Sequence, residues 1–217
     1  MKPWRDAARA VCEARSEAES RAQWGLPPET PLPYNYRLEH VRAVVALAGR
    51  LARDLGADEV VVEAAAWLHD IAKGTPQNGE DDHGQAAARE ASGLLADTDF
   101  PPEKIPAVCD AIVKHVGLTR EPGAPPVEPL EAAILWDADK LSKLGLTAVL
   151  HFARLGLIYP DARTTADAIQ SNRDWFPMNR AIAASFNTPL AREIGAARAA
   201  RFEAVWEELA REWAGEE

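Results

Sequence analysis

Four of the five histidines in this chain stand at the expected ends of helices, where their imidazoles could bind a metal ion. His40 opens one helical stretch and His69 closes the next, while His83 opens the following stretch and His115 closes its successor. In an antiparallel bundle with short connections, the starts of alternate helices and the ends of the intervening ones lie at the same end. The sequence therefore predicts that all four imidazoles cluster.

A carboxylate stands next to one of these histidines. Asp70 follows His69 in the last turn of a helix that is apolar on nearly every side, and the unpaired carbonyls at a helix C-terminus favour a nearby cation. Imidazole with carboxylate fits Mn²⁺, Fe²⁺, Co²⁺, Ni²⁺ or Zn²⁺ better than Ca²⁺, and the lack of thiolate ligands argues against a structural zinc site. We expect a divalent transition metal here. Lys73, one turn after His69, is placed to reach a bound anion.

Two aspartates on a later helix compete for the place of a further carboxylate ligand. Asp137 shares a helical stripe with apolar residues and points inward by periodicity, whereas Asp139 aligns with Leu135 and Ser142. At about 1.5 Å per residue, either aspartate lies roughly 10 Å or more from the start of its helix. An aspartate so far along the helix can reach the histidines only if the Gly/Pro-rich loop 117–129 displaces the whole helix relative to its neighbours. The residues alone leave both aspartates open.

Helices are expected over nearly the whole chain, because alanine, leucine, glutamate and arginine dominate and no alternating strand pattern is convincing. Their predicted bounds are about Trp4 to Trp24, Leu38 to Gly56, Glu59 to Lys73, His83 to Leu95, Pro102 to Val116, Leu130 to Leu144, a helix around His151, and Leu190 to Trp213. Residues 157–189 have three prolines among aromatics, which predicts a partly irregular cap. His151 lacks geometric support as a ligand and is expected to be structural or solvent-facing.

This organisation predicts an all-α fold with one principal domain. We expect a helix and a Pro-rich linker over residues 1–33, a core over residues 34–156, and a cap segment with a long helix over residues 157–217. A chain of 217 residues can bury one substantial core but cannot form a large multi-domain machine. Hydrophobic residues make up 47% and charged residues 27%, a balance typical of globular proteins.

Charge and cysteine content limit the partners and the compartment. The net charge of −10 disfavours a nucleic-acid polymer or an anionic membrane as partner. The only cysteines, Cys12 and Cys109, stand far apart in no metal-ligand spacing. The N-terminus lacks the apolar core of a signal peptide, and no apolar run approaches the roughly 20 residues that span a bilayer. We therefore expect a cytoplasmic protein that binds neither a nucleic-acid polymer nor a membrane.

Three segments together resemble the HD-domain superfamily of metal-dependent phosphohydrolases. They are Leu38-Glu39-His40-Val41-Arg42, Ala66-Trp67-Leu68-His69-Asp70-Ile71-Ala72-Lys73 and Ile134-Leu135-Trp136-Asp137-Ala138-Asp139-Lys140-Leu141, and the resemblance runs from about Arg37 to Gly156. It implies an HD-domain helical bundle with an N-terminal helical arm and a C-terminal helical extension. The implied metal ligands are His40, His69, Asp70 and Asp139. Asp139 is favoured over Asp137, despite periodicity, because the family's last ligand directly precedes a basic residue and leucine.

The resemblance extends to a second metal and to the substrate. His83 and His115 match the extra histidines of HD proteins that hold two metals, so it implies one or two ions. The tail from Phe186 to Arg192, followed by a long helix, looks like the end of small bacterial HD hydrolases, which are often associated with nucleotides. The implied reaction is hydrolysis of a phosphate ester or phosphoanhydride of a small molecule, with a nucleotide as the expected substrate.

The resemblance also implies a mechanism without a covalent intermediate, in which metal-activated water attacks phosphorus. Asp70 or Asp137 would accept the proton of the water, and Lys73 would offset charge that develops on the phosphoryl oxygens. Further candidates for contact with the substrate phosphate are Lys140, Lys114, Arg37 and Arg120.

Two other functions fit the same residues. The histidine and aspartate set could bind two irons and activate dioxygen, and the segment His69 to Lys73 is similar to the HD-x-x-K form found in the di-iron oxygenase branch as well as in some phosphodiesterases. A non-catalytic HD module that binds a nucleotide is the other alternative, which the complete ligand set disfavours. The Gly-Tyr-Pro signature of the cyclic-dinucleotide branch does not occur.

Overall fold

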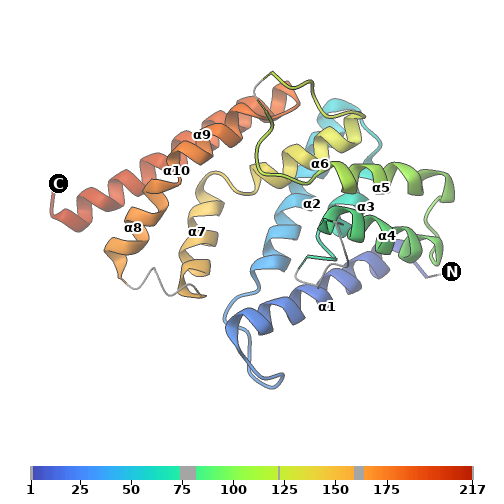
Figure 1. Ribbon diagram of the computed structural model, residues 1–217, viewed down its shortest axis with the longest axis horizontal. Helices are drawn as coiled ribbons and strands as arrows, with labels where there is room; N and C mark the ends of the chain where they lie inside the picture. Colours follow the sequence, from blue (N-terminus) through green and yellow to red (C-terminus); the bar gives the residue numbers. More distant parts are fainter. Residues whose placement is uncertain (1, 74–81, 122, 159–163, 217) are drawn as a thin grey trace.

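The described part of the protein is a bundle of helices (Figure 1). The computed structural model describes residues 2–73, 82–121, 123–158 and 164–216. Within these ranges no strand is present, and Lys2 and Thr98 form an isolated parallel bridge. The predicted all-α class is confirmed.

The elements in chain order are α1 (Trp4–Trp24), α2 (Tyr36–Leu55), α3 (Glu59–Leu68), α4 (His83–Ala96), η1 (Pro102–Lys104), α5 (Ile105–Lys114), α6 (Leu130–Leu141), α7 (Leu146–Leu155), η2 (Gly156–Ile158), α8 (Thr165–Asp174), α9 (Phe176–Ala184) and α10 (Pro189–Ala214). Side-chain oxygens of Asn35, Asp58, Asp82 and Thr188 accept hydrogen bonds from the first turns of α2, α3, α4 and α10. Such caps fix where a helix begins. In the described ranges no single helix is long and apolar enough to cross a membrane; α6 with α7 and η2 reach that length and composition only as a pair bent by 63°.

The main hydrophobic core surrounds α6, whose residues 132–141 are all buried. This helix packs against α2, α3, α5 and α10. The N-terminal helix α1 belongs to the same core, because Trp4, Ala8 and Cys12 are buried in it. The predicted N-terminal arm therefore lies against the bundle (Figure 1).

A second, smaller core lies among α7, α8, α9 and α10. It contains Ala148, Ile169, Phe176, Phe202 and Trp206. Figure 1 shows α8 and α9 lying along the long helix α10, with α7 between this group and the main bundle. Of the predicted, partly irregular cap over residues 157–189, residues 165–184 are mostly helical and form α8 and α9. Residues 159–163 lie outside the described ranges. The proline of α9 sits in its first turn, where the missing N–H breaks no helical hydrogen bond.

Two helix bounds near the histidines differ from the prediction. Helix α3 ends at Leu68, five residues before the expected end, and Ile71 and Lys73 instead donate backbone hydrogen bonds to the carbonyls three residues earlier. His69 and Asp70 therefore lie just beyond the helix, in a tighter turn. Helix α2 begins at Tyr36, so His40 lies in its second turn rather than at its start.

Candidate metal centre

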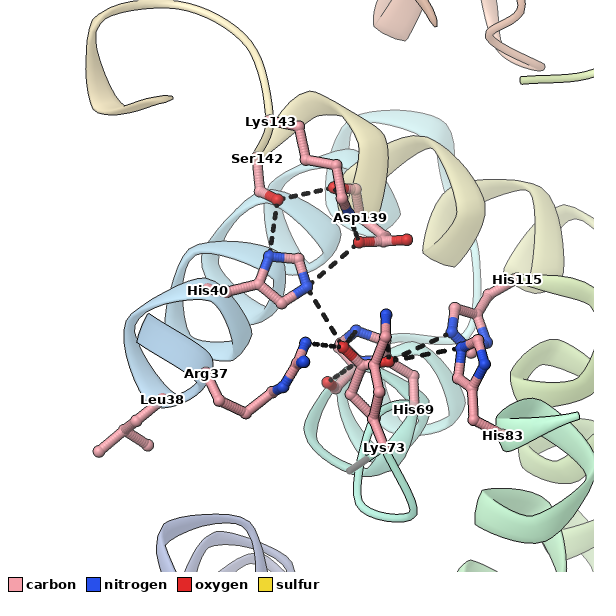
Figure 2. A network of polar contacts seen from close by, with 12 residues as sticks. Arg37, Leu38, His40, His69, Lys73, His83, His115, Asp139, Ser142 and Lys143 are labelled. Carbon is pink, nitrogen blue, oxygen red and sulfur yellow. Dashed lines mark hydrogen bonds and ion pairs between the residues drawn. The ribbon is translucent and has the colours of Figure 1, made fainter. Parts of the chain in front are cut away.

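Side chains from five helices meet in one buried centre (Figure 2). They are His40 from α2, His69 and Asp70 from the end of α3, His83 from the start of α4, His115 from the end of α5, and Asp139 from α6. The four imidazoles follow one another with neighbouring ring centroids 5.6, 5.0 and 5.2 Å apart. The structure thus brings together the four histidines that the sequence placed at one end of the bundle.

Asp70 lies between two pairs of histidines. Its Oδ2 is 3.6 Å from His40 Nε2 and 3.5 Å from His69 Nε2. Its Oδ1 is 3.5 Å from His115 Nε2 and 3.8 Å from His83 Nε2. Each carboxylate oxygen therefore faces a different pair of imidazoles, which is the arrangement that a bridging carboxylate needs.

Asp139 completes the side of the centre nearest α6. Its Oδ1 lies 3.2 Å from His40 Nε2. Potential ligand atoms of His40, His69 and Asp139 all lie within 4.8 Å of one another, and those of His69, Asp70 and His115 do so as well. Two overlapping groups of three could thus hold a metal ion.

Hydrogen bonds to backbone carbonyls orient two of the imidazoles. His69 Nδ1 lies 2.8 Å from the carbonyl oxygen of Ala66, and His115 Nδ1 contacts the carbonyl of Ile112. A carbonyl oxygen only accepts, so each Nδ1 carries the proton and donates. The lone pair of each ring is then on Nε2, the atom that faces the centre, and such outer hydrogen bonds are typical of metal-binding histidines.

A serine hydroxyl does the same for His40. Ser142 Oγ donates to the carbonyl oxygen of Asp139 at 2.6 Å, so towards His40 Nδ1, 3.0 Å away, it acts as an acceptor. Nε2 of His40 is again left with its lone pair toward the centre. The sequence reasoning did not single out Ser142, although its place three residues after Asp139 was a signal, because residues three apart share a helix face.

Three atoms of the centre are buried without a hydrogen-bond partner in the described ranges: His69 Nε2, Asp70 Oδ1 and His115 Nε2. A buried polar atom without a partner is costly, and most such atoms in folded proteins are paired. All three have lone pairs and lie close to one another, so a cation would satisfy them together. The nitrogen and oxygen donors fit the divalent transition metals that the sequence predicts.

The charge states also suit a cation. Burial lowers the pKa of His40 to about 4 and that of His69 to about 3, so both rings are neutral near pH 7, as metal ligands must be. Burial opposes ionisation of Asp70 and Asp139, but neighbouring histidine, lysine and arginine side chains hold both pKa values well below the usual range. The centre thus offers neutral imidazoles and ionised carboxylates.

Arg37, expected to contact the substrate phosphate, lies behind Asp70. Its Nη1 donates to Asp70 Oδ2 at 2.6 Å, while its Nε and Nη2 each lie 2.8 Å from a carboxylate oxygen of Glu19. The Arg37 side chain is only 11% exposed. This placement makes it a support for Asp70, and Glu19 of α1, which sequence reasoning missed, holds it there.

Lys140, another expected phosphate contact, is buried, with 1% of its side chain exposed. Its Nζ lies 2.6 Å from Asp139 Oδ2 and donates to the carbonyl oxygen of His115. The ammonium also lies 4.8 Å from the ring centroid of Trp136. These contacts surround the ammonium and tie Asp139 to the backbone of His115, so in this structure Lys140 is turned away from solvent.

The remaining two expected phosphate contacts are paired elsewhere. Lys114 Nζ lies 2.8 Å from Asp110 Oδ2 and 2.7 Å from the carbonyl oxygen of Glu128. Arg120 donates to carbonyl oxygens of the loop after α5 and, at 3.3 Å, to that of Ser185. These contacts join the loop before α6 to its neighbours, and they are not contacts with the histidine cluster.

Asp137 points inward, as periodicity predicts, but not toward the histidines. Its Oδ1 accepts from the backbone N–H and the side-chain amide of Asn187 at 2.7 and 3.0 Å. Its Oδ2 accepts from the backbone N–H and hydroxyl of Thr188 at 2.9 and 2.8 Å. Four donors occupy this carboxylate, so it clamps α10 to α6, and its expected role as proton acceptor is contradicted.

His151 is buried, with 5% of its surface exposed. Its Nδ1 contacts the hydroxyl of Tyr34, and its ring lies 4.9 Å from that of Tyr36. The solvent-facing alternative is therefore wrong, and the structural one fits.

One lysine keeps the position expected of a residue that contacts a bound anion. Lys73 Nζ lies 3.4 Å from Asp70 Oδ1, and its side chain is 39% exposed. The ammonium therefore contacts Asp70, while the side chain stays partly exposed to solvent.

Comparison with protein families gives a match to the HD domain over residues 37–144. The curated relatives that match are ribonuclease Y proteins of Clostridium perfringens, including that of strain 13, which are 33% identical over 105 residues. The match covers 48% of this chain but only 18% of those proteins. The chain thus spans less than a fifth of the length of these relatives.

Solved structures similar to this chain share its fold over almost the full length. A predicted HD superfamily hydrolase from an uncultured Thermotogales bacterium has a TM-score of 0.63 and 24% identity, with 96% of this chain and 92% of that chain covered. Bacillus subtilis YpgQ, solved in complex with ADP, has a TM-score of 0.62 and 19% identity, with 97% and 100% covered. An HD-superfamily hydrolase from Bacillus thuringiensis has a TM-score of 0.60 and 18% identity, with 95% and 98% covered.

Proposed function

The chain belongs to the HD-domain superfamily, and from this premise we propose that it is a metal-dependent phosphohydrolase that acts on a small phosphorylated molecule. One observation carries the proposal: three buried lone-pair atoms without hydrogen-bond partners, on His69, Asp70 and His115, meet in one place. One or two bound cations would satisfy all three. An anionic substrate is then attracted to a centre that faces solvent at Lys73.

We propose that the ion is held by His40, His69, Asp70 and Asp139. When bound, a divalent ion supplies the Lewis acidity that hydrolysis of a phosphate by water requires. The Nδ1 hydrogen bonds of His40 and His69 keep their Nε2 lone pairs directed at it. Arg37 and Glu19 hold Asp70 from behind, and this restricts the carboxylate to one orientation.

A second ion fits the other side of the same carboxylate. Asp70 Oδ1 faces His83 and His115, while Oδ2 faces His40 and His69. We propose that this half holds the second metal, less tightly than the first, because His83 is partly exposed. Replacing His83 with alanine should then lower the metal count from two toward one, and a wild-type protein with one ion per chain in excess metal would contradict this.

Two residues of the chain would act on the substrate. The pKa of Asp70 is held low, so its carboxylate is ionised and can accept a hydrogen bond from the attacking water at Oδ1. The ammonium of Lys73 lies 3.4 Å from that oxygen, where it can stabilise negative charge that develops on the phosphoryl oxygens. Asp70 and Lys73 would thus contact the water and the phosphate from the same edge of the centre.

We propose a nucleotide as the substrate. A protein of the same fold, YpgQ, was solved in complex with ADP, and the chain's net charge of −10 disfavours a long polyanion such as RNA. The expected cytoplasmic location is consistent with a nucleotide substrate.

The test combines metal analysis of the purified protein with a screen on phosphate esters and nucleotides. We expect bound Mn, Fe, Co, Ni or Zn and release of phosphate or pyrophosphate, both lost in His69→Ala. Iron together with substrate-dependent oxygen uptake would support a di-iron oxygenase instead. Nucleotide binding without turnover in the metal-loaded protein would support a non-catalytic module.

A further inference from the structure

Two lysines bind the carboxylate of Asp139, and they differ in freedom. Lys140 is 1% exposed, and its ammonium contacts a carbonyl oxygen and an aromatic ring as well. Lys143 is 21% exposed and donates to Asp139 Oδ1 and, at 3.2 Å, to the Asp139 carbonyl oxygen. Lys140 is therefore fixed in the interior, whereas Lys143 reaches Asp139 from the surface.

The oxygen that Lys143 binds is the one that faces the histidines. Asp139 Oδ1 lies 3.2 Å from His40 Nε2, whereas Oδ2 binds Lys140. A divalent ion held by His40 and Asp139 would therefore share Oδ1 with an ammonium. Two cations only a few ångströms apart repel each other, most strongly where solvent is scarce. Lys143 should leave this oxygen when the ion is held there.

The displaced ammonium stays beside the centre, because Lys143 stands four residues after Asp139, in the turn that directly follows α6. Figure 2 shows Lys143 beside Asp139, while Lys73 reaches the centre from a different side. The Nζ of Lys73 lies 3.4 Å from Asp70 Oδ1. An anion on the metal would lie between these two ammonium groups. The oxygens of this anion could accept the hydrogen bonds that the Lys143 ammonium no longer donates to Asp139.

We propose that Lys143 is a phosphate-binding residue that exchanges the carboxylate of Asp139 for a phosphoryl oxygen of the substrate. The inference rests on the proposed phosphohydrolase function. It gives the substrate a second cation besides Lys73, in the place that sequence reasoning had given to Lys140. The position three residues after Lys140 and four after Asp139 was the signal that could have found it.

The test measures the affinity of the Mn²⁺-loaded protein for inorganic phosphate and, separately, the affinity of the metal-free protein for Mn²⁺. The variants are Lys143→Ala, Lys143→Arg and, as matched control, Lys104→Ala. Lys104 has a similar exposure, 31%, and pairs with an aspartate, Asp58, at 2.7 Å. In Lys143→Ala we expect phosphate affinity to fall about tenfold, as for the loss of one charge-assisted hydrogen bond. Lys143→Arg should retain most of it, and Lys104→Ala should behave as wild type.

The Mn²⁺ measurement separates phosphate binding from support of the ligand. Lys143→Ala should bind Mn²⁺ at least as tightly as wild type, because a competing cation has been removed from Asp139. A tenfold loss of Mn²⁺ affinity would show that Lys143 only positions Asp139, and unchanged phosphate affinity would also overturn the proposal. If the wild-type protein binds Mn²⁺ but neither binds phosphate nor hydrolyses phosphate compounds, the proposed function itself fails, and the inference fails with it.

Discussion

The two faces of α6 each carry a buried aspartate, and the surroundings of these two residues are opposite. On the clamp face, Asp137 accepts four hydrogen bonds from Asn187 and Thr188. On the ligand face, Asp139 lies against His40 and receives two ammonium groups. Asp137 is 0% exposed and Asp139 is 5% exposed. Burial therefore does not distinguish a structural carboxylate from a functional one.

What distinguishes them is the kind of partner. Burial raises the pKa of Asp137, although its hydrogen bonds favour the ionised form, and neutral donors use both of its oxygens. Burial acts in the same direction on Asp139, but lysines and His40 hold its pKa well below the usual range. A carboxylate that is held ionised and that faces imidazoles with free lone pairs is suited to a metal. One enclosed by amides and a hydroxyl is suited to holding two helices together.

The largest effect that tests this comparison is expected from Asp139→Asn. The substitution keeps the shape of the side chain but removes the negative charge, and a neutral amide is a weak ligand for a divalent ion. We expect loss of bound metal and of hydrolysis, measured by metal analysis and turnover. Full metal content in Asp139→Asn would show that the ligand face does not bind the ion.

The next effect concerns the side of the metal centre that would contact the substrate. Lys73→Ala should keep its metal but lose turnover by roughly 10²-fold, as for other single electrostatic donors at an active site. If Lys73 only balances charge near the end of α3, its removal costs about 1 kcal/mol or less, because the side chain is partly exposed. Measuring kcat, metal content and melting temperature separates the two. A fully active Lys73→Ala would remove the residue from the mechanism.

The sequence predicted the positions of the histidines better than the surroundings of the charged residues. Helix starts and ends follow from caps and apolar periodicity, so they place His40, His69, His83 and His115 at one end of the bundle. Periodicity also places Asp137 inside, but it cannot tell which neighbour lies there. The donors of Asn187 and Thr188 come from a segment fifty residues later.

The surroundings of the basic residues could not be predicted for the same reason. Lys140 and Arg37 were candidates for contact with the substrate phosphate. In the fold they are turned inward, where each balances a carboxylate of the centre. The partly helical segment after α7 was missed for a local reason, since prolines at the start of α9 and α10 look like helix breakers but begin helices here.

On the clamp face, Asp137→Asn should lower stability without removing metal. The amide offers one acceptor oxygen and brings an NH₂ group into contact with donors, so at least one buried hydrogen bond is lost. Such a loss costs about 1–3 kcal/mol. Denaturant unfolding measures the change, and metal analysis of the folded variant serves as control. Loss of metal in Asp137→Asn together with its retention in Asp139→Asn would reverse the assignment of the two faces.

The smallest expected effect is a pH dependence of the free energy of unfolding, caused by the histidines that lie around the ligand face of α6. In the unfolded chain His40 and His69 have pKa values of about 6.5, whereas burial lowers them to about 4 and about 3 in the folded protein. Between these values the unfolded state binds more protons, so stability falls as the pH falls. For metal-free protein we expect the free energy of unfolding to drop by about 1 kcal/mol per histidine between pH 6.5 and pH 5.5.

Variants of the two faces should affect this slope differently, which makes it a test of the comparison. Asp137→Asn should keep the slope, because the protons are taken up by histidines on the other face. His40→Gln should reduce it, because one of the buried rings no longer titrates; His83 and His151, whose pKa values are also lowered by burial, supply part of what remains. Denaturant unfolding at several pH values in the presence of a chelator measures the slope. A wild-type stability that stays constant or rises from pH 6.5 to 5.5 would mean that the rings of the ligand face accept protons in the folded protein, and would contradict their assignment as neutral imidazoles ready to bind a metal.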